Sequence, residues 1–279
     1  MARLIDPRRH GIAAALAAAM LALSAAAPPV ASEEVPARPT VTAVEGVEGA
    51  FRFRFSDGSV RERERAVGAV LVFAADGRQN RIRIAGVRPD PSRPESRHLL
   101  HDFRDLATGE PLCDPGPDGT REGFPVPRRV VAPDGTTRLD PGGFEISCTS
   151  GALAKCVRFG YEPWRAERTD LWLACIRMVR ADYCGDDVAH TRDGTMIDVY
   201  DDLAVQTPDL VPTQAFEAGW TSEGAVCVAH PRIAEDLTLP DLERTCPRLA
   251  GRTGPAACTE ATARAAGARL YVRSTPNNP

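Results

Sequence analysis

An acidic stretch between residues 182 and 202 holds the side chains best suited to chemistry. It contains His190, whose imidazole can take up or release a proton near neutral pH. A carboxylate next to an imidazole is what general acid–base catalysis needs, so His190, Asp182 and Asp198 are the candidate catalytic residues of a hydrolase. The alternative is that His190 is an ordinary contact of a β-hairpin. The stretch contains seven aspartates: Asp182, Asp186, Asp187, Asp193, Asp198, Asp201 and Asp202.

The same carboxylates suggest a second chemistry, calcium binding. Calcium takes six to eight oxygen ligands, and Asp186, Asp187 and Asp193 are the candidate ligands. Their spacing does not match an EF-hand loop, and aspartate is also an ordinary residue of turns. A solvated acidic face is therefore the competing interpretation.

Other familiar catalytic patterns are absent from the sequence. Four histidines follow the N-terminal apolar segment, at His98, His101, His190 and His230, and none belongs to an H-E-x-x-H motif. There is no G-x-S-x-G elbow and no glycine-rich phosphate loop. No cofactor is predicted.

Asp182 occupies an unusual position in the last turn of a predicted helix. A negative charge there opposes the helix dipole, so something must compensate it. The structural interpretation is an ion pair with Arg158, Arg177 or Arg180. The functional one is a catalytic or ligand-binding carboxylate.

Eight cysteines lie beyond residue 112, and an even number in an exported chain favours four disulfides. No C-x-x-C pair is present, which argues against a zinc site. Their pairing is open among 105 connectivities. The cysteines are Cys113, Cys148, Cys156, Cys175, Cys184, Cys227, Cys246 and Cys258.

Two helices are predicted in the cysteine-rich half, over residues 151–159 and 169–183. At 1.5 Å per residue, Cys175 and Cys184 would lie about 13 Å apart along the second helix, too far for a disulfide. Cys156 and Cys175 both face the seam of this helical hairpin and could pair.

Strands are predicted before residue 98. Phe51, Phe53 and Phe55 alternate with arginines, and a second alternation runs over residues 61–65. Asp-Gly pairs at 57–58 and 76–77 predict turns of an antiparallel meander, and the pair at 134–135 predicts a separate hairpin over residues 128–139. Asp193-Gly194 gives the strongest hairpin signal. We therefore expect an α+β fold, with an N-terminal antiparallel β meander followed by a disulfide-rich half built on a helical hairpin and a β-hairpin.

The N-terminus resembles a signal peptide. Arg3, Arg8 and Arg9 precede an apolar run over residues 11–27. Cleavage after Ser32 is favoured over cleavage after Ala26, and a retained membrane anchor is the alternative. The expected organisation is a signal peptide at 1–32, a β-rich segment at 33–97, a cysteine-rich domain at 98–265 and a C-terminal tail at 266–279.

The charge pattern argues against nucleic-acid binding. The net charge is −4 at pH 7, and Lys155 is the only lysine. The arginines are spread among acids rather than gathered in a basic stripe. Tyr161, Trp164, Trp172 and Trp220 could form a glycan or peptide platform if exposed, but core positions are favoured for them.

Three segments in order resemble the ADYC-domain family of bacterial exported proteins. They are residues 148–156, the Gly-Tyr-Glu-Pro-Trp run at 160–164, and residues 177–185 with Ala181-Asp182-Tyr183-Cys184. Residues 191–201 also fit, although Asp187 stands where the family often has glycine. The resemblance implies one extracytoplasmic domain and no particular activity.

These observations predict a periplasmic or secreted binding module stabilised by disulfides, without a membrane span in the mature chain. Its partner would be a protein or glycan ligand. The alternative is an extracytoplasmic hydrolase that uses the acidic segment around His190 and Asp198.

Intact mass measurement of protein recovered from its native compartment tests this interpretation. We expect loss of the leader up to Ala26 or Ser32, and alkylation of eight cysteines only after reduction. Free thiols before reduction, or an uncleaved leader, would contradict it.

Overall fold

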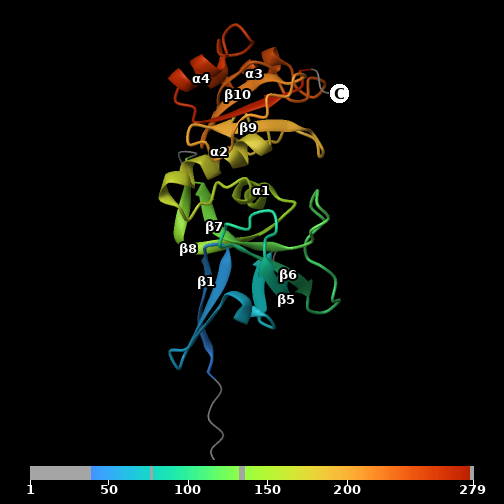
Figure 1. The fold of residues 1–279 in the computed structure, drawn as a ribbon, viewed down its shortest axis with the longest axis vertical. Helices are drawn as coiled ribbons and strands as arrows, with labels where there is room; N and C mark the ends of the chain where they lie inside the picture. Colours follow the sequence, from blue (N-terminus) through green and yellow to red (C-terminus); the bar gives the residue numbers. More distant parts are fainter. Residues whose placement is uncertain (1–38, 76–77, 132–135, 277–279) are drawn as a thin grey trace, which may run out of the picture. The chain divides into compact units, whose positions relative to one another are not determined.

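The computed structural model describes residues 39–75, 78–131 and 136–276 (Figure 1). The expected signal peptide and the Asp-Gly turns at 76–77 and 134–135 lie outside these residues. The described chain is mixed and rich in strands, with three antiparallel sheets and four α-helices. None of these helices is long and apolar enough to cross a membrane.

The first sheet is the predicted phenylalanine meander. Phe51 and Phe53 are buried, whereas Arg52 and Arg54 point the other way and pair with glutamates. The predicted strand at 61–65 is wrong beyond Glu62, because Arg63 adopts a positive φ of 56° and starts a 3-10 helix, η1 (Arg63–Ala66). The sheet order is β1-β2-β3, with β1 (Val41–Val47), β2 (Ala50–Phe55) and β3 (Val60–Glu62).

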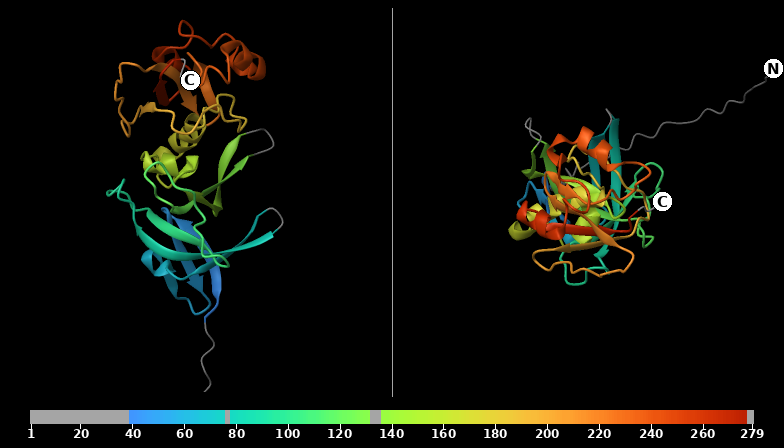
Figure 2. Two further views of the ribbon diagram at one scale, coloured as in Figure 1. Left: turned by 90° about the vertical axis from the view of Figure 1, so that its right-hand side faces the viewer. Right: turned by 90° about the horizontal axis from the view of Figure 1, so that it is seen from above.

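A five-stranded sheet packs against this meander. Its strands follow chain order, and Figure 2 shows the β4–β5 and β7–β8 pairs as long ribbons. Phe51, Ile84 and Phe103 belong to the core that both sheets share. The strands are β4 (Val70–Ala75), β5 (Arg78–Pro89), β6 (Leu99–Asp105), β7 (Gly123–Val131) and β8 (Thr137–Cys148).

A four-stranded sheet and the helices form the cysteine-rich half. Helix α2 packs on β10, β11 and β12, and α1 packs on β7 and β8. The sheet order is β11-β10-β12-β9, with β9 (Ile197–Asp201), β10 (Ala215–Thr221), β11 (Gly224–Val228) and β12 (Leu270–Ser274). The α-helices are α1 (Ala152–Arg158), α2 (Thr169–Val179), α3 (Leu239–Thr245) and α4 (Glu260–Ala265), and two further 3-10 helices are η2 (Ala166–Arg168) and η3 (Pro247–Leu249).

All eight cysteines are paired, as expected. The predicted link between the two helices of the hairpin is confirmed as Cys156–Cys175, with 5.8 Å between the Cα atoms. The other three disulfides are Cys113–Cys148, Cys184–Cys246 and Cys227–Cys258.

The predicted hairpin at Asp193-Gly194 is wrong. These residues form a turn, but residues 188–192 are not a strand, and β9 pairs with β12 instead. The β-hairpin of this half is β10–β11, closed by Ser222 and Glu223. Local bonds replace strand pairing here, because the backbone N–H groups of Asp186 and Val188 donate to the carboxylates of Asp182 and Asp186, and that of His190 donates to the carbonyl of Arg180.

The sheets are not interrupted at the predicted boundaries after residues 97 and 265. The five-stranded sheet contains strands from both sides of residue 97, and residues from Pro39 onward cluster as one compact unit. The expected tail at 266–279 contains β12, which lies between β10 and β9. Burial explains this, since Leu270, Tyr271 and Val272 are all fully buried in the strand.

His101 on β6 is a buried imidazole in the shared core. Its ring packs edge-on against Phe51 and stacks on Phe103, with centroids 5.1 and 5.7 Å apart. Burial is the main reason that its pKa falls from 6.5 to about 4. The folded protein therefore keeps His101 neutral at a pH where the unfolded chain protonates it.

We expect the free energy of unfolding to fall as the pH drops from about 6.5 to about 4, by up to about 3 kcal/mol from this residue. His101→Phe keeps an aromatic ring in the core and should remove this part of the pH dependence. Urea unfolding at several pH values measures it. His190→Phe is the matched control and should keep the wild-type dependence, whereas an unchanged dependence in His101→Phe would contradict the assignment.

Candidate functional site

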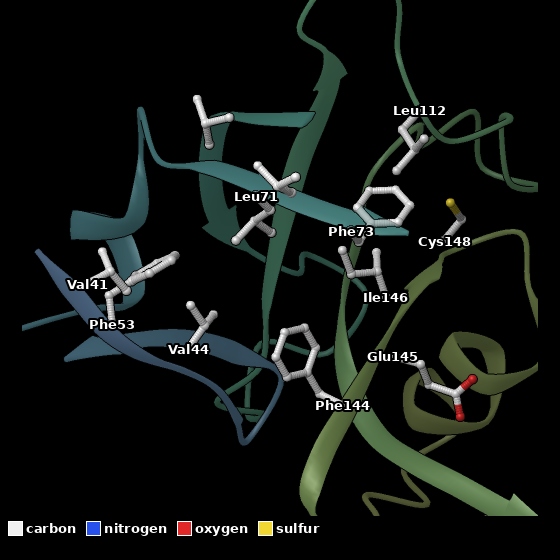
Figure 3. Close-up of a pocket in the computed structure, with 12 residues that line it drawn as sticks. Val41, Val44, Phe53, Leu71, Phe73, Leu112, Phe144, Glu145, Ile146 and Cys148 are labelled. Atoms are coloured by element: carbon white, nitrogen blue, oxygen red, sulfur yellow. The ribbon is translucent and has the colours of Figure 1, made fainter. Parts of the chain in front are cut away.

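An apolar groove of about 620 Å³ opens between the three-stranded and five-stranded sheets (Figure 3). Its lining is aliphatic and aromatic except for Glu145 and Cys148. The lining residues are Val41, Val44, Phe53, Val70, Leu71, Val72, Phe73, Leu112, Phe144, Glu145, Ile146 and Cys148.

The groove exists because the strands around it are edge strands. β4 and β8 are the outer strands of the five-stranded sheet, and β1 is an outer strand of the meander. Within the described ranges, each has a strand partner on one side only. An edge strand presents unpaired N–H and C=O groups along its free side.

The backbone edge of β4 borders the groove directly. Side chains alternate across a strand, so Leu71 and Phe73 point to one face and Val70 and Val72 to the other. All four nevertheless line the groove. β1 approaches β8 closely at Gly46, where an added Cβ would lie 2.9 Å from Phe144 Cβ, so only glycine allows this contact.

The apolar lining is partly open to solvent. Val41 is 51% exposed and Val72 is 55% exposed, and both line the same groove, which makes its apolar surface accessible. The carboxylate of Glu145 accepts hydrogen bonds from the backbone N–H of Arg129 at 3.1 Å and from its Nε at 3.3 Å. The one charge in the lining is thereby compensated inside the sheet.

Asp182 lies at a corner beyond the end of α2, so its predicted place in the last turn of a helix over 169–183 is wrong. The helix ends at Val179, and the chain turns at Ala181, which takes a positive φ. Asp182 is fully buried, and its carboxylate accepts the backbone N–H groups of residues 185, 186 and 187 at 2.8 to 3.1 Å. Arg177 Nη1 donates to it at 2.6 Å. Of the ion pairs considered from the sequence, the structure contains the one with Arg177.

The proposed catalytic residues do not come together. Asp198 is buried and accepts backbone N–H groups from Asp209 and Leu210. His190 stacks on Tyr183, with ring centroids 6.2 Å apart. In the described part of the chain, no hydrogen bond or ion pair joins any two of His190, Asp182 and Asp198, and their catalytic role stays a prediction.

The calcium candidates are also dispersed. Asp186 accepts the backbone N–H of Val188, Asp187 pairs with Arg177, and Asp193 lies exposed in its turn. Residues 39–75, 78–131 and 136–276 contain no group of three or more histidine, cysteine or acidic side chains that could hold a metal ion.

The Ala-Asp-Tyr-Cys run joins the end of α2 to the four-stranded sheet. Ala181 takes a positive φ of 49°, and the Tyr183 hydroxyl donates to Glu217 at 3.0 Å and accepts the backbone N–H of Arg232 at 2.7 Å. Burial, with the Glu217 charge next in weight, raises the pKa of Tyr183 well above its ordinary value. The phenol stays a neutral donor, and Cys184 closes the corner through its disulfide.

The aromatic platform considered from the sequence is mostly core. Tyr161, Trp172 and Trp220 are fully buried, and Trp164 is partly buried. The apolar groove was not predicted from the sequence. The one sequence feature that points to the groove is the run Val70-Leu-Val-Phe73, which is apolar on both faces of an edge strand.

Asp182→Asn tests the structural role of this carboxylate. The amide keeps one acceptor oxygen for four donors and leaves Arg177 buried without its full counter-charge. We expect the free energy of unfolding to fall by about 3 kcal/mol or more, measured by chemical denaturation. Asp193→Asn makes the same change at an exposed site and should be nearly neutral. Wild-type stability of Asp182→Asn would contradict the role.

Comparison with known proteins places the chain in a family without naming an activity. No curated protein and no solved structure matches it. A family model for the ADYC domain matches residues 63–234, which include β4 and β8 of the groove and the whole Asp182 corner. The chain therefore belongs to the ADYC-domain family.

Proposed function

We propose that this protein is an extracytoplasmic binding module that takes an extended apolar polypeptide segment as an added strand in the groove between β1, β4 and β8. Four disulfides are typical of domains that work in oxidising compartments. The leader-like N-terminus of the sequence supports the same location.

The observation that carries the proposal is that unpaired strand edges border an apolar groove. A polypeptide can use both features together, because its backbone pairs with the free edge while alternate side chains enter the groove. Val70 and Val72 lie on β4, the edge strand whose free backbone N–H and C=O groups would pair with the added segment.

A fatty acid fits the groove less well. Its carboxylate needs a cation or several N–H donors, and the charged lining side chain is itself acidic, Glu145. An acyl chain also leaves the free strand edges unpaired. We therefore favour a polypeptide over a lipid.

Selection from a displayed library of random eight-residue peptides, followed by calorimetry, tests the proposal. Each selected peptide is compared with a copy that carries N-methyl groups on alternate residues, and laurate serves as the lipid probe. We expect N-methylation to weaken binding about tenfold or more, because it removes the backbone donors and leaves the side chains in place. Equal binding of the methylated copy, tighter binding of laurate, or no selected peptide would contradict the proposal.

Substitution in the groove gives a second test. Val72→Arg places a charge and bulk on the rim of β4 and should weaken peptide binding about tenfold or more while the fold stays intact. Val60→Arg is the matched control, since Val60 is an exposed valine on β3 outside the groove. Wild-type affinity in Val72→Arg, or an equal loss in Val60→Arg, would contradict binding at this groove.

A further inference from the structure

A buried polar cluster brings a serine, a histidine and an aspartate together in the loop between β5 and β6. The Ser96 hydroxyl lies 2.7 Å from His98 Nδ1, and His98 Nε2 lies 3.0 Å from Asp90 Oδ2. The side chains of His98 and Asp90 are fully buried, whereas Ser96 is partly exposed. None of the three lines the apolar groove.

The surroundings define the charge states of this cluster. Burial disfavours ionisation of Asp90, but hydrogen bonds from His98 and Ser92 outweigh it and hold its pKa well below the usual range. Arg158 Nε also pairs with Asp90 at 2.9 Å. Asp90 is therefore a carboxylate that orients His98 by accepting its Nε2–H, which turns Nδ1 toward Ser96.

Glu162 is a second base beside the same hydroxyl. Its Oε1 lies 2.5 Å from Ser96 Oγ, and its charge is compensated by Arg165 and Arg168. The Ser96 hydroxyl is thus held between an imidazole and a carboxylate. In this arrangement the Ser96 hydroxyl donates to Glu162 Oε1, so it must rotate toward His98 Nδ1 before His98 can accept its proton. The backbone N–H of His98 points to Ser96 Oγ at 3.4 Å.

A cavity of about 270 Å³ lies beside the cluster. It is lined by Glu162, which accepts the hydrogen bond of the Ser96 hydroxyl, and by Arg97, the next residue in the chain, whereas Ser96 and His98 are not lining residues. Such a space suits a short acyl group better than a polymer, and Arg97 and Arg165 bring positive charge to its wall. The remaining lining residues are Glu48, Trp164 and Glu167.

We propose that Ser96, His98 and Asp90 form a nucleophile, base and positioning residue that hydrolyse short carboxylic esters, an activity separate from binding in the groove. Ser96 Oγ attacks the ester carbonyl and its proton passes to His98 Nδ1. The ester C–O bond breaks, and the alcohol leaves with that proton. Water then attacks the acyl-serine with His98 as base, which releases the acid and restores the hydroxyl.

The test uses the full oxidised chain and a fluorophosphonate probe. Ser96 Oγ forms a bond to phosphorus, the P–F bond breaks, and fluoride and the hydroxyl proton are released. We expect one phosphonyl group per chain, located on Ser96 by peptide mass spectrometry, and no labelling after denaturation. A folded wild-type chain without label on Ser96, or equal labelling of the denatured chain, overturns the proposal whatever the variants do.

Variants provide the matched comparison, with p-nitrophenyl acetate as substrate. Ser96→Ala and His98→Gln should lower kcat/KM about 100-fold or more. Ser59→Ala removes an exposed serine hydroxyl from the turn between β2 and β3, outside the cluster, and should keep labelling and hydrolysis. Hydrolysis by folded Ser96→Ala at the wild-type rate overturns the proposal.

Discussion

The buried ion pair between Arg177 and Asp182 is the constraint on which the cysteine-rich half depends. Two opposite charges in the interior are stable only when every remaining hydrogen-bonding position is filled. Here the carboxylate of Asp182 accepts hydrogen bonds from three backbone N–H groups, and Asp187 is a second acidic partner of Arg177. Since these bonds come from residues just after α2, they also determine how the chain turns there.

The consequences of that turn extend to the four-stranded sheet. Once Ala181 bends the chain, Tyr183 reaches Glu217 on β10, and Glu217 in turn pairs with Arg232 at 2.9 Å. All three side chains are fully buried, so the network is sensitive to any lost partner. The residues that name the family thus have a structural role in this chain, which separates them from the search for a ligand site.

The two candidate sites arise from different features of the β-rich part. The groove exists because antiparallel sheets that do not close leave free edges, and the meander covers only part of them. The Ser96 cluster exists because the loop at 90–98 must be fastened to the helical hairpin. Asp90 reaches Arg158 at the end of α1, and Ser96 reaches Glu162 in the turn that follows. Fastening that loop therefore also assembles the three groups that the proposed ester hydrolysis needs.

The sequence by itself determined the local features of this protein. Alternation of phenylalanine and arginine specified β2, and the apolar spacing around Cys156 and Cys175 predicted a helical hairpin in which these two cysteines could pair. The residues of the family signature can be read directly from the sequence. These features depend on residues at most about one helical hairpin apart in the chain, such as the 19 positions between Cys156 and Cys175, and over such distances period and propensity decide the outcome. Tertiary structure decided the rest, because it depends on contacts between distant segments. β9 pairs with β12 from the far end of the chain, the groove needs β1 and β8 side by side, and Ser96 meets Glu162 across 66 positions. No local pattern records such contacts, since they follow from how whole sheets and helices pack.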